Sequence, residues 1–192
     1  MVSSGITGRT FTLETLFLGK TTYAIEYYQR EYEWGPDEVQ TLLHDLVEEF
    51  KRADGARKAR WWSQQLTQHF LGPFVYTDEP GDKRFLADGK QRFTTLHLIF
   101  LHLLRALPDS ASKKIERRLT GAVVAGYHRD RPRFRLELDE RQQAMEALLD
   151  DHHYEVPLGA SLSLQNLWAR SQQIAGDLSQ QFDSDQLDPF VD

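Results

Sequence analysis

Residues 85–96 read Phe-Leu-Ala-Asp-Gly-Lys-Gln-Arg-Phe-Thr-Thr-Leu, and this stretch decides the fold. Its first part has the composition of a strand, and Gly89 permits a tight turn after it. From Phe93 onward, apolar residues recur at helical spacing up to Leu104, and Pro108 ends the run. The stretch therefore predicts a strand, a glycine turn and a helix whose first amide groups point outward.

The charged residues of this junction suit it to binding an anion. The free amides at a helix N-terminus bind anions, and Lys90 and Arg92 add positive charge beside them. We expect Asp88 to hold Mg²⁺ or to orient water, and Gln91 to position that water. A capped helix start in which Arg92 pairs with Asp88 fits the same spacing, and the residues alone leave both readings open.

A second polar segment lies upstream and is rich in aromatic side chains. It contains Tyr28, Gln29 and Arg30, followed by Tyr32 and Trp34. These groups are costly to bury together without hydrogen-bond partners, so we expect some of them to line a cleft. Aromatic faces stack on bases, and Arg or Gln side chains read base edges or phosphates. The alternative is a strand end in which Tyr32 and Trp34 complete the core.

The order of the remaining elements predicts an α+β fold, with a small mixed β-sheet packed against helices and followed by a helical half. We expect a core over residues 1–108, carrying both polar segments, and a mainly helical extension of the same domain over 109–192. The expected helices cover residues 12–19, 36–50, 90–107, 110–126, 139–150 and 161–182, and the expected strands cover 21–25, 69–76, 83–87 and 133–138, with 69–76 at an edge because of Gly72 and Pro73.

Composition excludes several classes of protein. The 192 residues are 40% hydrophobic and carry a net charge of -6, which predicts a soluble globular chain without bulk attraction to nucleic acid. Because the chain has no cysteine, disulfide frameworks, thiol catalysis and thiolate zinc sites are excluded. The sequence shows neither a signal peptide nor a membrane span, so we expect a cytoplasmic protein with no membrane partner.

Positive charge is concentrated in residues 105–135, which we call the basic window. This window carries nine basic and three acidic residues, so it could dock a polyanion, although such runs are more often solvated helix faces. If the window docks a polyanion, we expect Arg117 and Arg118 to contact DNA phosphates. The basic residues are Arg105, Lys113, Lys114, Arg117, Arg118, Arg129, Arg131, Arg133 and Arg135.

Taken together, the two polar segments resemble the N-terminal domain of GmrSD-type restriction proteins, a family that includes the phosphorothioate sensor SspE. The family's Tyr-Gln-Arg run corresponds to residues 28–30, its Phe-Leu-Gly element to residues 70–72, and its Asp-Gly-Gln-Gln-Arg hallmark to residues 88–92. The resemblance implies a fold like that of ParB and sulfiredoxin, hydrolysis of a nucleoside triphosphate (GTP or ATP) with Mg²⁺, and restriction of modified foreign DNA in antiviral defence.

The resemblance also implies roles for individual residues. Asp88, Gln91 and Arg92 would be catalytic, with Asp88 also holding the metal ion. From the aromatic segment and the basic window, rather than from the resemblance, we expect Tyr28, Tyr32, Trp34, Arg117 and Arg118 to sense DNA or its modification. Gln29, Arg30, Gly89, Lys90, Thr94 and Thr95 would bind the nucleotide.

Two positions depart from the family pattern. Lys90 replaces the first Gln of the hallmark, and Glu26 stands where the family usually has Pro. Lys90 helps phosphate binding but removes an amide that could orient water.

Members that cut DNA carry an HNH nuclease domain downstream, so we expect that nuclease outside this chain, either in a longer protein or on a partner. The alternative functions are a modified-DNA-binding module without turnover and a structural scaffold for the nuclease, and a homo-oligomer is compatible with each of them.

Overall fold

The computed structural model describes residues 7–25, 31–58 and 70–181, and the side chains of 53–58 are not among them. The Tyr-Gln-Arg run thus lies outside the described residues. The described elements are α1 (Leu13–Phe17), β1 (Thr22–Ile25), α2 (Pro36–Lys58), β2 (Val75–Glu79), β3 (Lys83–Asp88), α3 (Lys90–Ala106), α4 (Lys113–Val123), β4 (Val124–His128), β5 (Arg131–Phe134), β6 (Leu136–Glu137), the 3-10 turn η2 (Asp139–Arg141), α5 (Gln142–Leu149) and α6 (Leu162–Gln181).

The main sheet has the strand order β2-β3-β1-β6. β2 and β3 form an antiparallel hairpin, whereas β1 runs parallel to both β3 and β6. The register places Ile25 opposite Leu86 and Ala24 opposite Glu137. Because the carboxyl ends of parallel strands meet at one edge of a sheet, the segments that follow β1, β3 and β6 all start from the same edge.

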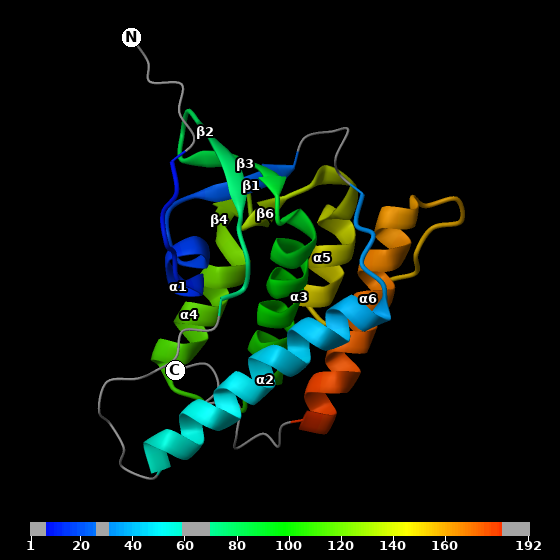
Figure 1. The fold of residues 1–192 in the computed structure, drawn as a ribbon. Helices are drawn as coiled ribbons and strands as arrows, with labels where there is room; N and C mark the ends of the chain where they lie inside the picture. Colours follow the sequence, from blue (N-terminus) through cyan, green and yellow to red (C-terminus); the bar gives the residue numbers. More distant parts are fainter. Residues whose placement is uncertain (1–6, 26–30, 59–69, 182–192) are drawn as a thin grey trace.

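Helix α3 stands at the centre of the helical layer below the sheet, with α1 and α4 on one side and α5 and α6 on the other (Figure 1). Ten of its residues are buried, including Phe93 and Leu98. Aromatic rings pack where this helix meets the sheet, since Phe93 stacks on Phe17 and contacts Tyr23. Helix α2 crosses in front of α3 and packs on α6. The helix that begins at the glycine turn is therefore the main core element.

The structure confirms the predicted α+β class and its small mixed sheet. Three boundaries were wrong: the helix expected over 36–50 continues to Lys58, and the strand expected over 133–138 is divided into β5 and β6, which belong to different sheets. The helix expected over 110–126 ends at Val123, and residues from Val124 onward form β4. Adjacent β-branched residues favour a strand, and Val124 pairs with Phe134 of β5, which a helical reading of the spacing overlooks. β2 lies at a sheet edge, as expected, and starts only at Val75.

No helix in the described part combines the length and apolar character of a membrane crossing.

Candidate functional site at the start of helix α3

The turn between β3 and α3 requires a glycine for two reasons. Gly89 has a φ of 80°, in the left-handed region that other residues rarely adopt. A Cβ at this position would also lie 2.6 Å from the Phe74 ring and 3.1 Å from the Pro73 carbonyl oxygen. The exposed Asp88 carboxylate closes the turn, because its Oδ1 accepts a hydrogen bond from the Gly89 amide at 2.7 Å. The predicted strand, turn and helix are thus all observed.

The first turn of α3 carries the opposite charge from the one that helices favour. Gly89 provides no side-chain cap, and the turn contains Lys90 and Arg92 but no acidic residue. The first bond of the helix runs from the Phe93 amide to the Gly89 carbonyl at 2.9 Å. Among the described residues, no acceptor occupies the amides of residues 90–92. Cations at a helix N-terminus cost roughly 0.3–1 kcal/mol each, and a bound anion would offset this cost.

Arg92 does not pair with Asp88, as one reading of the sequence proposed. Its Nη1 donates to the Pro73 carbonyl oxygen at 3.1 Å, and its guanidinium lies 5.4 Å from the centre of the Phe74 ring. It also lies against the backbone of Gly72, where a Cβ would come within 2.9 Å of Nη1. Within the described part of the chain, no carboxylate takes the remaining donors of Arg92, which are available to an anion.

The Gln91 carboxamide is bound at both of its polar atoms. Nε2 donates to the Glu31 carbonyl oxygen and Oε1 accepts from the Glu33 amide, each at 3.0 Å. Gln91 thereby fixes the segment 31–33 to the start of α3. The sequence assigned Gln91 to water; in this geometry its amide positions the backbone, and one Nε2 hydrogen and one Oε1 lone pair remain for a water molecule.

Tyr32 is a core residue and presents no face to a nucleic acid. It is 1% exposed, and its hydroxyl donates to Thr95 Oγ1 at 2.8 Å, because Thr95 itself donates to the Gln91 carbonyl. Burial raises the pKa of Tyr32 to about 12. This geometry contradicts the predicted sensing role of Tyr32 and fits the alternative, a side chain that completes the core. Trp34 is half-buried and also packs on the core.

The backbone of Tyr32 is held from the side of α6. Its amide donates to Ser163 Oγ at 2.9 Å, and its carbonyl oxygen accepts from Asn166 Nδ2 at 3.0 Å. The buried Arg141 donates to the same Ser163 hydroxyl at 2.6 Å and lies 5.8 Å from the centre of the Tyr32 ring. Helices α3 and α6 therefore clamp the segment 31–33 together: Gln91 of α3 bonds Glu31 and Glu33, and α6 bonds Tyr32 between them.

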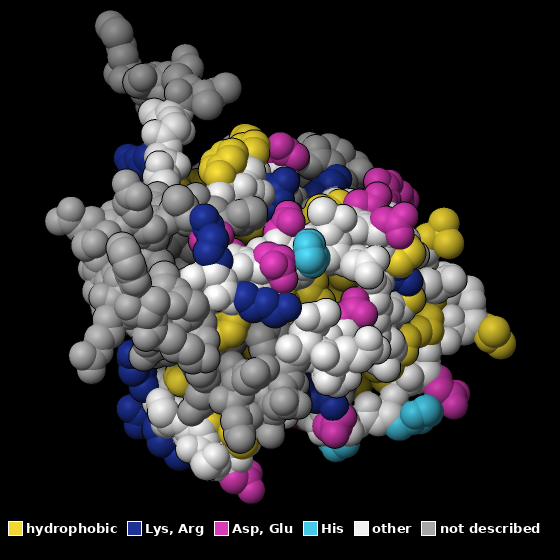
Figure 2. All heavy atoms as spheres, turned by 60° about the horizontal axis from the view of Figure 1, so that its bottom comes forward, with side chains coloured by type: hydrophobic (Ala, Val, Ile, Leu, Met, Phe, Trp, Pro, Cys, Tyr) yellow, Lys and Arg dark blue, Asp and Glu magenta, His cyan; other side chains and the backbone are white. Residues whose placement is uncertain are grey.

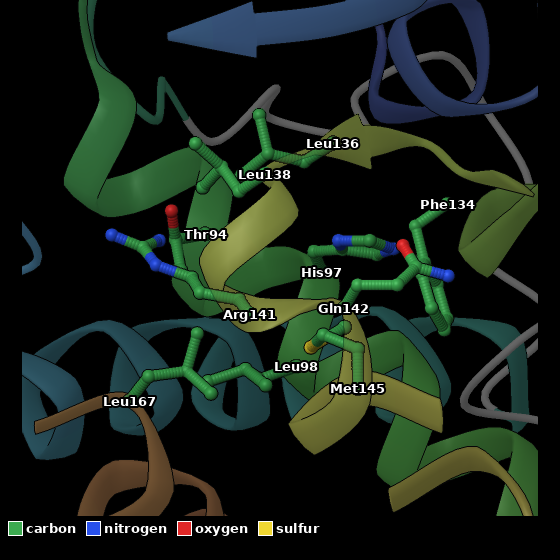
Figure 3. A pocket seen from close by; sticks show the side chains of 10 residues that line it. All are labelled: Thr94, His97, Leu98, Phe134, Leu136, Leu138, Arg141, Gln142, Met145 and Leu167. Carbon is green, nitrogen blue, oxygen red and sulfur yellow. The ribbon is translucent and has the colours of Figure 1, made fainter. Parts of the chain in front are cut away.

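Thr94 and Thr95 are buried at 3% and 0% exposure, so neither is placed to touch a nucleotide, contrary to expectation. Thr94 lines an internal cavity of about 10 Å³, the size of one water molecule. Figure 3 shows Thr94 and the Arg141 guanidinium at one end of this cavity, and His97 and Gln142 toward the other. Apolar side chains complete the lining, and the space is far too small for a nucleotide.

The two buried histidines of α3 are structural. His97 donates from Nε2 to the Val123 carbonyl oxygen at 2.9 Å, and His102 Nε2 bonds Ser171 Oγ at 2.8 Å. Burial lowers the pKa of each imidazole to about 4, so both stay neutral near pH 7. The described residues contain no group of three or more His, Asp or Glu side chains that could hold a metal ion.

Comparison with known families now places the chain. Residues 13–186 match the N-terminal domain of the GmrSD restriction endonuclease, which covers most of the sequence. The chain belongs to this family. Restriction endonucleases act on DNA, so this is the N-terminal domain of a DNA-targeting restriction system. A search of curated proteins gave no match.

The GmrSD hallmark of this chain, residues 88–92, is the junction described above. The companion residues Tyr28, Gln29 and Arg30 and the departure at Glu26 lie outside the described residues. The residues that flank them are both held beside the hallmark: Ile25 pairs with Leu86 in the sheet, and Glu31 is bonded to Gln91. The chain therefore enters and leaves its Tyr-Gln-Arg segment next to the start of α3.

The basic window of this GmrSD domain is largely neutralised by its own structure. Arg105 pairs with Asp151, Lys113 with Glu116 and Arg131 with Glu146. Arg133 pairs with Glu137, and Arg118 lies 3.6 Å from Glu14. Figure 2 shows basic and acidic side chains intermixed across the middle of one face, and a group of Lys and Arg side chains at the lower left edge of that view. Arg117 is exposed on α4.

Arg135, the last residue of the window, is buried at 4% exposure. Its Nη1 donates to the carbonyl oxygens of Gly19 at 2.7 Å and Thr21 at 2.9 Å, and its Nη2 donates to that of Gly121. Burial lowers the pKa of Arg135. This side chain therefore joins the α1–β1 connection to α4 and cannot reach DNA.

Sequence reasoning missed two contributors to the site. Arg141 lies in the turn η2 after β6 and is buried, and nothing in the neighbouring sequence marks it as a buried residue. Residues 72–74 contact both Gly89 and Arg92, whereas the sequence suggested only an irregular edge strand. The Gly-Pro pair was a signal of special backbone geometry, since Gly72 has a φ of 93°.

Proposed function

We propose that this domain binds and hydrolyses a nucleoside triphosphate, GTP or ATP, at the start of helix α3. One observation carries the proposal: a long core helix begins without a side-chain cap and places Lys90 and Arg92, rather than acids, beside its free amides. Cations at this end lower the stability of the helix, and a bound phosphate group would offset that loss. The amides of residues 90–92 and the guanidinium of Arg92 are the groups that would hold it.

The residues present are compatible with Mg²⁺ brought in by the nucleotide. Mg²⁺ at phosphate sites needs one or two protein carboxylates, and the exposed Asp88 supplies one at the turn. When bound, the ion would neutralise charge on the phosphate oxygens. Arg92 would add a fixed positive charge, and Gln91 would keep the 31–33 segment in place next to it.

The Tyr-Gln-Arg segment would complete this site from the neighbouring strand. Support comes from its anchors, because β1 and β3 end at the same sheet edge and Glu31 is tied to Gln91. In this proposal Gln29 and Arg30 contact the nucleotide, Tyr28 contributes to sensing of modified DNA, and turnover licenses an HNH nuclease located outside residues 1–192.

Phosphate release tests the enzymatic part of the proposal. The assay uses each of the four nucleoside triphosphates with Mg²⁺, and compares the wild type with Asp88→Ala and with Asp109→Ala. Asp109 is an exposed carboxylate in a different turn and serves as the matched control. We expect hydrolysis by the wild type and Asp109→Ala and a loss of about 100-fold in Asp88→Ala. Equal rates for all three proteins would remove the enzymatic function and leave a binding module or a scaffold.

A further inference from the structure

Residues 72–74 bridge the two ends of the Asp-Gly-Lys-Gln-Arg turn. On one side, the Phe74 ring and the Pro73 carbonyl fill the space where a Cβ on Gly89 would lie. On the other side, the Pro73 carbonyl oxygen accepts a hydrogen bond from Arg92 at 3.1 Å. The same short segment therefore contacts both the amide-bearing turn and its arginine.

The contact at Gly72 involves the whole guanidinium group. A Cβ at this position would lie 2.9 Å from Nη1, 3.0 Å from Cζ and 3.0 Å from Nη2 of Arg92. Real Cβ atoms essentially never approach so closely, so any side chain here would displace the guanidinium. The missing side chain at Gly72 thus sets where the charge of Arg92 lies.

The Phe74 ring limits the guanidinium from another direction, with 5.4 Å between Cζ and the ring centre. The ring is itself anchored in the core by an edge contact with Phe93, at 6.2 Å between ring centres. A cation held against a fixed aromatic ring and a backbone carbonyl loses much of its freedom before any ligand arrives. The ligand then does not have to order this long side chain.

We propose that residues 72–74 form a cradle that positions Arg92 for the triphosphate, and that Gly72 and Phe74 are positioning residues of the site. This inference rests on the proposed function for its ligand, but not for its geometry. Neither residue has to touch the nucleotide. Both act through the guanidinium, whose displacement by about 1 Å can cost about 100-fold in rate.

The chain offers a matched control for the glycine. Gly159 has a φ of 80°, close to the 93° of Gly72, but a Cβ there would meet nothing within 4 Å. An alanine at either position strains the backbone in the same way, and only Gly72→Ala moves Arg92. Phe74→Leu is a second variant, which keeps apolar packing and removes the ring.

The experiment is a double-mutant cycle on kcat/KM for the triphosphate that the wild type hydrolyses. We expect Gly72→Ala to lose about 100-fold and Gly159→Ala to stay within about twofold of the wild type. We expect Gly72→Ala to cost nothing further when Arg92 is already alanine. Phe74→Leu should show the same pattern. Equal losses in Gly72→Ala and Gly159→Ala, or losses that multiply in the double variant, would overturn the proposal.

A second readout keeps the cradle testable if the wild type hydrolyses no nucleotide. Phenylglyoxal modifies accessible guanidinium groups, and mass spectrometry gives the modification rate of Arg92 in each protein. We expect faster modification of Arg92 in Gly72→Ala than in the wild type and Gly159→Ala, with Arg117 as an internal reference. Unchanged modification of Arg92 would refute the cradle, whereas absent hydrolysis with faster modification would refute only the proposed function.

Discussion

The start of α3 carries two cations and the basic window carries nine, yet the surroundings of these cations differ in kind. At the start of α3, Arg92 bonds a backbone carbonyl, and no acidic residue pairs with it among the described residues. In the basic window, Arg105, Arg131 and Arg133 each pair with a carboxylate, and Arg135 is buried. Charge density along a sequence therefore says little about anion binding unless the internal partners are known.

The difference has a physical origin. A cation on a solvated surface is stabilised by water, and pairing with a nearby acid adds at most about 1 kcal/mol. Helix α3 instead has free amides and two cations at the same end, which is favourable only with an anion present. The region that breaks a rule of helix electrostatics is the better functional candidate, even though it contains fewer cations.

The largest effect on activity is expected at Arg92, and Arg117 of the basic window is the residue compared with it. Arg92→Ala should lower kcat/KM for triphosphate hydrolysis by about 1000-fold, because it removes a fixed charge at the phosphates. Arg117→Ala, in the basic window, should stay within about twofold of the wild type. Phosphate release at saturating Mg²⁺ measures both. Similar losses in the two variants would show that the regions do not differ.

The second prediction concerns stability and separates two arginines within the basic window. Arg135→Met leaves the carbonyls of Gly19, Thr21 and Gly121 without their donor, so the free energy of unfolding should fall by about 3 kcal/mol. Arg131→Met breaks an ion pair at a side chain that is 66% exposed and should cost less than about 1 kcal/mol. Urea unfolding gives both values, and a mild effect at Arg135 would contradict its structural role.

The third prediction uses pH to test the buried side of α3. His97 has a pKa lowered to about 4 by burial, with a further lowering from Arg135, whereas an unfolded histidine titrates near pH 6.5. The unfolded chain therefore binds the extra proton, and stability should fall as pH drops from about 6.5 toward 4. His97 contributes roughly 1.4 kcal/mol per pH unit in that range. In urea unfolding at pH 7, 6 and 5, His97→Gln should show a shallower loss, and an unchanged slope would argue against a buried neutral imidazole.

The smallest effect is expected for DNA binding by the window. Arg117→Glu should weaken binding to modified and unmodified duplexes equally, by less than about tenfold at low salt, because it acts on phosphates alone. Fluorescence anisotropy over a salt series measures this change. A loss confined to the modified duplex would instead place modification sensing on α4 and reverse the comparison.

Local pattern predicted the most informative element correctly. The strand, the left-handed Gly89 and the core helix from Lys90 follow from turn chemistry and from apolar spacing, which are properties of neighbouring residues. The parallel pairing of β1 with β3 was not predicted, because it joins residues about 60 positions apart and leaves no local mark.

The site residues that failed did so for a related reason. Tyr32 and Thr95 have polar groups that suit a binding cleft, but each satisfies the other inside the core. The basic window appeared unbalanced because its partners come from elsewhere, as in the pair of Arg105 with Asp151. Hydrogen bonds between distant segments decide whether a polar side chain is available, and no periodicity in the chain reports them.

One consequence follows from the way α3 joins its exposed first turn to the centre of the core. A helix with ten buried residues cannot shift without repacking the interior, so the helix end that we propose to bind phosphate is held in a fixed position. A conformational change caused by ligand binding must therefore occur in the segments attached to this end of the helix. The segment 31–33 is one of these, because it is hydrogen-bonded to Gln91 of α3 and also to Ser163 and Asn166 of α6, near the far end of the sequence.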